Sequence, residues 1–430
     1  MADDRKPKEP QDLPEGWKWV KLGEVAENKK FSIVDGPFGT QLHSDEYIED
    51  GEIPVVRVIN LSFEGKFIEK DLVFISQQKA KQLSRSKVVP GDIIIAKTGA
   101  TIGKCGVFPK SFLEGIIASS CMKVSIDKTK ASNLFLLFWL VSRHGQNAII
   151  NSAFGTTRTT INISPFKNLL IPLPPLPEQR KIAQILETVD NAIEKTEKII
   201  EKYKRIKQGL MQDLLTKGID EKGNIRSEKT HKFKDSPLGR IPEEWEVVRL
   251  GEILKYEQPQ KYIVKSEEYD EKSGVPVLTA GKTFILGYVD ENEGICNDLP
   301  VILFDDFTTD SRYINFPFKV KSSATKILRA RDKSIDLFYV YNALQLIRLK
   351  PSSDHKRFWI SEYSKMFMPL PPLSEQKRIA EILSQIDQAI EKEEKYKQKL
   401  ERLKKGLMED LLTGKVRVNK LLEGESHGMA

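Results

Sequence analysis

The chain contains the same proline-led segment twice. Residues 171–216 align without a gap with residues 368–413, and 28 of the 46 paired positions are identical. The identities include Pro-Leu-Pro-Pro-Leu (172–176 and 369–373), a Glu-Gln pair, a Gly-Leu-Met triplet and the final Asp-Leu-Leu-Thr. A match this dense is an internal duplication, so the chain must fold as two related halves.

Each copy predicts a stiff connector followed by one long helix. The prolines favour an extended lead-in. Pro177 and Ser374 suit the first helical turn, and Glu178 and Glu375 then meet the positive end of the helix dipole. Forty residues from 177 to 216 correspond to a helix of about 60 Å.

Apolar residues recur in steps of three and four along both helices, which predicts a coiled coil with a change of phase near Thr196 and Glu393. The predicted seam is Ile182, Leu186, Val189, Ile193, Ile199, Tyr203, Ile206, Leu210 and Leu214, then Ile379, Leu383, Ile386, Ile390, Tyr396, Leu400, Leu403, Leu407 and Leu411. Because duplicated halves imitate a twofold dimer, we expect the two helices to pair antiparallel. At Gly209 and Gly406, inside the helices, we expect another backbone to approach closely.

A weaker match precedes each repeat, where LPEGWKWVKLGEV (13–25) resembles IPEEWEVVRLGEI (241–253). The chain is therefore a tandem of variable domain and long helix. The predicted boundaries are a flexible N-terminus at 1–12, a first domain at 13–172, a first helix at 173–217, a linker at 218–240, a second domain at 241–369, a second helix at 370–413 and a tail at 414–430. Short β-branched runs ended by glycine and separate helical patterns make both domains mixed α/β, so the predicted fold class is α+β.

Composition narrows the function classes. With 68 basic and 61 acidic residues the net charge is +7, which is compatible with a polyanionic partner. Three cysteines without a CxxC pair and five scattered histidines predict no metal site and fit a reducing cytoplasm. The charged N-terminus is no signal peptide, and the longest apolar run, 134–141, predicts a buried helix rather than a membrane span.

Catalytic signatures are missing from the sequence. The segment GATIGKC (99–105) is one residue short of a phosphate-binding loop and lacks its Ser or Thr, so a strand-turn-strand is expected there. No dinucleotide or S-adenosylmethionine loop, methyltransferase motif, catalytic triad or nuclease-like acidic cluster is found. We therefore expect a protein that is not an enzyme and whose chemistry comes from partners.

The repeated PLPPLPEQRKIAQIL unit, the segment GDIIIAKTGATIGKCGVF (91–108) and the two Pro-Glu-x-x-Trp openings resemble the specificity subunit of type I restriction-modification systems. The resemblance implies two target-recognition domains that each read one half of a split, asymmetric site in double-stranded DNA. It also implies that the helices act as a spacer and help to dock two methyltransferase subunits, which recruit the ATP-driven restriction subunits. No cofactor is then expected in this chain, since S-adenosylmethionine, ATP and Mg would be bound by the partners.

DNA readers combine phosphate contacts with base-edge contacts, and polar loops punctuated by glycine suit both. For each such residue a solvated loop is the alternative. The candidates are Thr40, Gln41, Arg57, Asn60, Lys97, Thr98, Thr156, Thr157 and Arg158 in the first domain, and Lys282, Arg312, Tyr313, Lys326, Lys356 and Arg357 in the second. The alternative hypothesis for the whole chain is a coiled-coil scaffold whose variable domains bind proteins.

Overall fold

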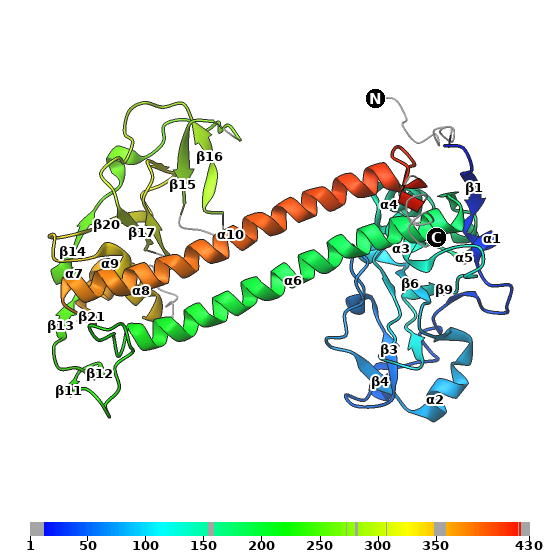
Figure 1. Cartoon of the computed structure of the whole chain (residues 1–430), viewed down its shortest axis with the longest axis horizontal. Helices are drawn as coiled ribbons and strands as arrows, with labels where there is room; N and C mark the ends of the chain where they lie inside the picture. The colour runs from blue at the N-terminus through cyan, green and yellow to red at the C-terminus, as the bar shows by residue number, and fades with distance from the viewer. Residues whose placement is uncertain are drawn as a thin grey trace, which may run out of the picture. The chain divides into compact units, whose positions relative to one another are not determined.

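The computed structural model describes residues 13–153, 159–271, 273–279, 283–306, 308–347, 358–419 and 421–422. Two compact units divide the chain: one contains Met1–Thr196 and Tyr396–Ala430, and the other contains Glu197–Lys395. Each unit therefore combines one variable domain with half of each long helix (Figure 1).

The first unit contains two four-stranded sheets and a two-stranded ribbon. One sheet has the antiparallel order β2-β9-β6-β7, the other has the order β4-β3-β8-β5 with β3 and β8 parallel, and the ribbon pairs β1 with β10. The strands are β1 (Lys18–Lys21), β2 (Ile33–Asp35), β3 (Ile53–Val56), β4 (Val73–Ile75), β5 (Lys87–Val88), β6 (Ile93–Ala96), β7 (Cys105–Val107), β8 (Gly115–Ile117), β9 (Cys121–Val124) and β10 (Leu170–Leu173).

The predicted buried helix is confirmed as α3. Ser132 caps its N-terminus by accepting a hydrogen bond from the amide of Phe135, and residues 135–140 are buried in the main core of the unit. Ser142 ends this helix and caps the next one in the same way. The helices of the domain are α1 (Leu22–Val25), α2 (Gln77–Gln82), α3 (Asn133–Val141), α4 (Arg143–Asn151) and α5 (Ile163–Lys167).

The second unit repeats the first sheet and the ribbon on an unmatched sequence, but its second sheet has three strands, and β11 and β12 form an additional pair. Its first sheet has the order β14-β20-β17-β18, its second has β16-β15-β19 with β15 and β19 parallel, and β13 and β21 form the ribbon. The elements are β11 (Phe233–Ser236), β12 (Gly239–Pro242), β13 (Glu246–Arg249), β14 (Leu254–Glu257), β15 (Val275–Leu278), β16 (Ile285–Val289), β17 (Val301–Asp305), β18 (Ser311–Ile314), β19 (Lys319–Val320), β20 (Thr325–Ala330), β21 (Phe367–Leu370), α7 (Leu250–Ile253), α8 (Leu337–Leu346) and α9 (Phe358–Ser361).

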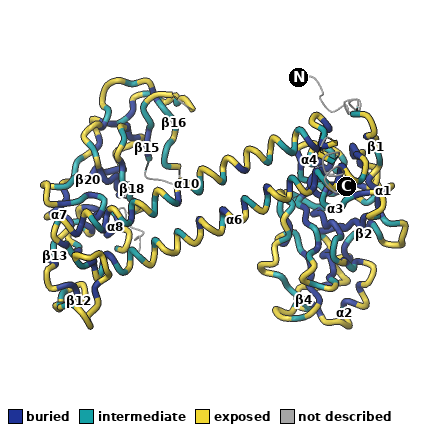
Figure 2. The backbone as a smooth tube through the Cα atoms, viewed as in Figure 1, coloured by how far each residue is buried: buried dark blue, intermediate teal, exposed yellow. Residues whose placement is uncertain are grey.

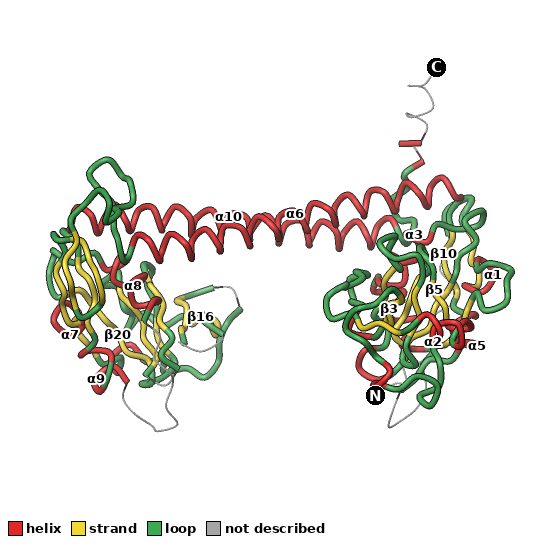
Figure 3. Tube along the Cα trace, turned by 90° about the horizontal axis from the view of Figure 1, so that it is seen from below, coloured by secondary structure: helices red, strands yellow, loops and turns green. Residues whose placement is uncertain are grey.

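The two repeats form the long helices α6 (Leu176–Leu214) and α10 (Leu373–Leu411), seen as continuous coils in Figure 3. In the first unit Asp190 of α6 pairs with Lys404 of α10 at 2.6 Å. In the second unit Lys207 pairs with Asp387 at 2.6 Å. The repeat aligns Asp190 with Asp387 and Lys207 with Lys404, so the same ion pair occurs twice in antiparallel order.

Four of the predicted seam positions, all after the change of phase, are exposed. Ile199, Ile206, Tyr396 and Leu403 are 40–50% exposed. Ile200 is buried in place of its neighbour Ile199, and the two helices turn exposed faces to solvent over their middle portions (Figure 2). Thr196 is also buried, so the covered positions of α6 run through Thr196, Ile200 and Tyr203 rather than through Ile199.

Gly209 and Gly406 also differ from the prediction. A Cβ atom added at either glycine would meet nothing in the described chain within 4 Å. No backbone of this chain approaches them in the part that the structure describes, although an interior glycine costs a helix about 1 kcal/mol relative to alanine.

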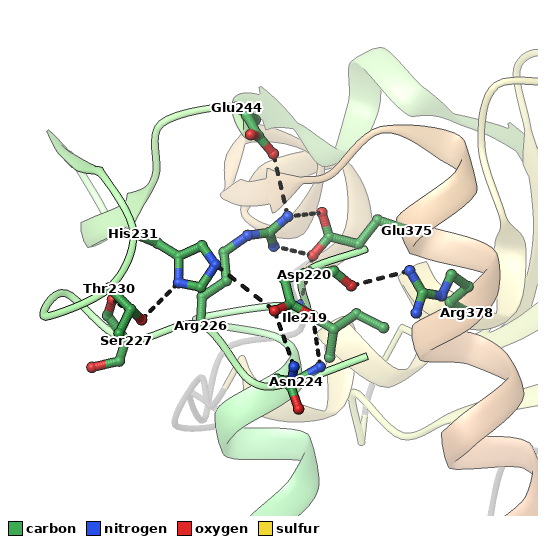
Figure 4. Close-up of polar contacts among 10 residues, drawn as sticks. All are labelled: Ile219, Asp220, Asn224, Arg226, Ser227, Thr230, His231, Glu244, Glu375 and Arg378. Carbon is green, nitrogen blue, oxygen red and sulfur yellow. Dashed lines mark hydrogen bonds and ion pairs between the residues drawn. The ribbon is translucent and has the colours of Figure 1, made fainter. Parts of the chain in front are cut away.

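The first turn of α10 is fixed by a buried cluster around Glu375. This carboxylate accepts hydrogen bonds from both terminal nitrogens of Arg226 (Figure 4). It also accepts them from the amide of Ile219 (2.8 Å) and from Trp245 Nε1 (3.1 Å). The segment 218–226, expected to be linker, is therefore folded against the start of α10.

Glu178 has the same environment in the first unit. It accepts hydrogen bonds from Trp17 Nε1 (3.1 Å) and from Arg417 Nε (2.7 Å) and Nη2 (2.9 Å). Arg417 follows α10, so the C-terminal segment does in this unit what the segment after α6 does in the other. We call each Trp-Glu-Arg cluster a clasp.

The glutamine that follows each clasp glutamate in the repeated Glu-Gln pair is also held by hydrogen bonds. Gln179 Oε1 accepts a hydrogen bond from the amide of Ser132, and Gln376 Oε1 accepts one from Asp336, both at 2.8 Å. Each Nε2 donates to the carbonyl oxygen five residues earlier, again at 2.8 Å. Every polar atom of these buried amides is thus paired, and each long helix begins at a fixed position on its own domain.

Candidate nucleic-acid interface

In the first unit, one edge of the β2-β9-β6-β7 sheet gathers the predicted loops. Because neighbouring strands are antiparallel, the ends of β2 and β6 and the starts of β9 and β7 share this edge. The amide of Gly36 donates to the carbonyl of Cys121 (3.0 Å), and that of Lys97 donates to Ser120 (2.9 Å). The loops 36–44 and 97–104 therefore leave the sheet side by side.

A third loop joins them. The amide of Ile161 donates to the carbonyl of Lys97, and that of Gly99 donates to Thr159, both at 2.9 Å. From α4, Gln146 Nε2 donates to the carbonyl of Gly103 (2.9 Å), which holds the far side of the 97–104 turn. The 3-10 turn between β6 and β7 is the strand-turn-strand that the sequence predicted.

Several predicted residues of the first domain lie at this edge. Thr40 and Gln41 are exposed, and Thr98 is half-buried in the loop after β6. Lys97 is half-buried, and its Nζ lies 3.1 Å from Asp35 Oδ1. Thr156, Thr157 and Arg158 lie outside the described residues.

Asn60 and Arg57 have internal roles instead. Asn60 is fully buried, accepts a hydrogen bond from the amide of Arg57 (3.0 Å) and donates to the carbonyls of Ile68 (3.0 Å) and Lys70 (3.2 Å). The guanidinium of Arg57 donates to the carbonyl of Asp71. In this conformation the Asn60 side chain has no atom left for a base.

The second unit has an equivalent edge. The end of β14 contributes Gln258, the end of β17 leads to Thr308, and β18 carries Arg312, all exposed. Lys326 is buried beneath them, where its Nζ donates to Gln258 Oε1 (3.2 Å) and the carbonyl of Ser323 (2.6 Å).

The other predicted residues of this domain divide in two groups. The Tyr313 ring packs edge-on against Phe338, with centroids 4.9 Å apart, and burial raises the pKa of Tyr313. Tyr313 is therefore mainly a packing residue. Lys282, Lys356 and Arg357 lie outside the described residues.

Sequence reasoning missed two aromatic–cation pairs at these edges. Lys104 Nζ lies 5.6 Å from the centroid of the Phe63 ring in the first unit. The Arg312 guanidinium lies 5.6 Å from the centroid of Phe284 in the second. Both pairs join residues that are distant in sequence, so no local sequence motif predicts them.

No group of three or more His, Cys, Asp or Glu side chains that could hold a metal ion occurs among the described residues. In the same part of the chain, no helix is both long enough and apolar enough to cross a membrane.

Two domains with the same first-sheet strand order, each joined to one copy of a duplicated helix, define a class of tandem two-domain proteins, and comparison with known proteins identifies the family. The model of the type I restriction modification DNA specificity domain matches residues 14–205 and 242–402. The chain belongs to this family, the specificity subunits of type I restriction-modification systems.

Individual relatives support this assignment. The chain is 30% identical over 432 residues to the putative type I restriction enzyme MjaX specificity subunit of Methanocaldococcus jannaschii, covering 95% of each chain. It is 45% identical over 165 residues to the EcoR124I/EcoR124II specificity subunit of Escherichia coli, covering 37% of this chain and 40% of that one. The crystal structure of the M. genitalium S subunit shares the fold, with a TM-score of 0.62, 19% identity and coverage of 94% and 98%.

Membership fixes the coarse function. Type I specificity subunits are the DNA sequence-recognition components of their complexes, assemble with other subunits and are not themselves catalytic. The predicted family, fold class and non-enzymatic role are therefore confirmed.

Proposed function

We propose that the chain reads an asymmetric, bipartite site in double-stranded DNA, with one half-site for each domain. The observation that carries this proposal is the pair of sheet edges, which have the same strand order and different side chains. Equal scaffolds place the loops alike, while unequal side chains read different bases. An asymmetric protein of this kind fits an asymmetric sequence.

The base and phosphate contacts are assigned to the loops at these edges. The described candidates are Thr40, Gln41, Lys97 and Thr98 for one half-site and Arg312 for the other. The sequence adds Thr156, Thr157 and Arg158 to the first set and Lys282, Lys356 and Arg357 to the second, all outside the described residues. Lysine and arginine would neutralise phosphates and fix the register, while the threonines and Gln41 suit base edges.

The long helices are proposed to set the gap between half-sites. Thirty-nine residues in α6 correspond to a rise of about 58 Å, which exceeds the roughly 34–36 Å of one duplex turn. Removing one heptad from each helix in register should narrow the gap or abolish activity. An unchanged gap would mean that the helices do not measure it.

Each long helix also carries a second face that fits a partner. Four basic residues recur at identical repeat positions, with apolar residues and a glycine beside them at helical spacing, and all of them are exposed. They are Lys195, Lys198, Ile199, Lys202, Arg205, Ile206 and Gly209 in α6, and Lys392, Lys395, Tyr396, Lys399, Arg402, Leu403 and Gly406 in α10.

Because this face occurs twice, it suits two copies of one partner. The bare glycines would let a helix backbone come close, the apolar residues would bury its apolar stripe, and the basic residues favour acidic side chains beside that stripe. We assign the face to the two methyltransferase subunits, through which restriction subunits would join. S-adenosylmethionine, ATP and Mg would then bind to those partners, and the complex would work in the cytoplasm.

The test is to assemble the chain with its methyltransferase subunit and map methylation on random duplexes. A split motif with a fixed gap is expected. If no such motif emerges and duplex binding does not weaken steeply with salt, the scaffold hypothesis takes its place.

A further inference from the structure

A partly exposed aromatic ring lies on a hydrogen-bonded turn of the first unit. Phe63 is 44% exposed. Beside it, Ser62 Oγ accepts hydrogen bonds from the amides of Glu64 (3.2 Å) and Lys66 (3.0 Å), and the Ser62 carbonyl accepts one from Cys105 (2.9 Å). The turn is thus tied to the start of β7, at the candidate interface.

The base of this turn is fixed as well. Leu61 is fully buried in the core cluster that the half-buried Phe67 also contacts. The two residues form an isolated β-bridge. Asn60 closes the loop below them through the buried hydrogen bonds described above. The backbone on both sides of Phe63 is therefore fixed by hydrogen bonds and buried neighbours, while the Phe63 side chain stays 44% exposed.

A cation accompanies the ring. Lys104, the last residue of the 97–104 loop, places its amine over the Phe63 ring. In the second unit Arg312 lies over Phe284, and Arg312 belongs to β18, the strand that takes the place of β7 in the sheet order. An aromatic–cation pair thus recurs beside the same edge strand, although the two domains do not match in sequence.

We propose that Phe63 is a wedge that presses between base steps of the DNA while Lys104 contacts the adjoining phosphate. This inference rests on the proposed DNA-reading role of the sheet edge. Apolar side chains that enter a base step unstack it and bend the duplex, and the energy required depends on the sequence being deformed. The first domain would then select its half-site partly by deformability. Phe284 is half-buried, so in the second domain we expect the Arg312 guanidinium rather than the ring to contact the DNA.

The experiment uses the assembled complex and its selected site, with 2-aminopurine placed at successive positions through and beside the first half-site. The wild-type complex should raise the fluorescence at one step, where the probe is unstacked. Phe63→Ala should remove this rise and weaken binding roughly tenfold, the scale of losing one stacked base. Phe63→Trp should retain the rise.

Two further variants separate ring from charge. The slope of log affinity against log salt is negative, and Lys104→Gln should reduce its magnitude by about 0.9, the value for one phosphate contact. Phe63→Ala should leave the slope unchanged. Leu113→Ala is the matched control: Leu113 is 92% exposed on the β7–β8 connection and should change neither signal.

The inference is overturned if Phe63→Ala binds the selected site with wild-type affinity and fluorescence. It is also overturned if the substitution impairs assembly with the methyltransferase subunit instead, because the ring would then be a protein contact. If the wild-type complex selects no DNA sequence, the proposed function itself is wrong. This result is distinct from the two outcomes that overturn only the role of Phe63.

Discussion

In the first unit Glu178 binds Trp17 and Arg417, and in the second Glu375 binds Trp245 and Arg226. The two units differ at the sheet edges. The first unit has a Lys97–Asp35 ion pair where β6 ends, and the second has the buried Asp305 and Asp306 where β17 ends. The difference teaches that the two halves share the residues that attach each domain to the helices and differ at the sheet edges, which we propose to face the DNA. Perturbing both members of each equivalent pair tests this division.

The largest effect is expected at the clasps. Arg226→Ala would leave the buried Glu375 carboxylate without its cation, which costs about 3–5 kcal/mol of unfolding free energy. Arg417→Ala should cost less, because the Arg417 side chain is 26% exposed and that of Arg226 only 10%. Urea unfolding followed by hydrogen exchange would measure the loss and locate it in one unit.

Arg240→Ala, at an exposed ion pair with Glu228, should change stability by no more than about 1 kcal/mol. Equal, small losses at all three arginines would contradict the clasp.

A smaller loss is expected from a glycine inside one clasp. Gly218 has φ +66°, and an added Cβ would overlap Glu375 Oε1 and the Trp245 ring. Gly218→Ala should therefore cost more than the roughly 1–2 kcal/mol of the left-handed backbone alone. Gly239→Ala is the control, since Gly239 also has a positive φ but meets nothing within 4 Å. The same denaturation experiment compares them, and equal losses would show that the overlap is relieved.

Gly209 and Gly406 should respond in the opposite direction. Alanine at either position meets no atom of the described chain, so it should stabilise the free protein by up to about 1 kcal/mol. It should also weaken assembly with the methyltransferase subunit, because the added methyl group would hold the partner's backbone away. Thermal unfolding and native mass spectrometry measure the two effects. If the variants are stabilised and still assemble as well as the wild type, the methyltransferase subunit does not dock on this face.

The smallest effect concerns the duplicated ion pair. Double-mutant cycles on Asp190–Lys404 and on Lys207–Asp387 should each give a coupling energy of about 0.5–1 kcal/mol, because all four side chains remain partly exposed. The two couplings should match within error and shrink together with added salt. A coupling present in one unit and absent from the other would break the equivalence of the two helix pairings.

The duplication predicted the architecture well. Paired helices in antiparallel order follow from the repeat itself, and the buried positions 182–193 and 379–390 follow from their spacing. The seam was misassigned at Ile199 because Ile200 is equally apolar and only the packed helix pair selects between them. The clasps join Trp, Glu and Arg from segments far apart in sequence, so spacing could not reveal them.

The interface was less predictable than the fold. The polar loops named from the sequence lie at the ends of strands, but residue type could not separate surface from interior. Asn60 and Lys326 look like base or phosphate contacts in the sequence, yet hydrogen bonds to distant carbonyls hold both inside. Phe63 is the reverse case, an aromatic residue that the sequence analysis did not single out and that is 44% exposed in the fold.

The central claim is that each domain reads its own half-site independently on a shared helical frame. Exchanging residues 13–172 for the corresponding domain of a relative, with the clasp residue Trp17 retained, and mapping methylation by the assembled complex tests it most directly. The account predicts that one half of the recognised sequence changes while the other half and the gap stay the same. A change in both halves, or in neither, would contradict it.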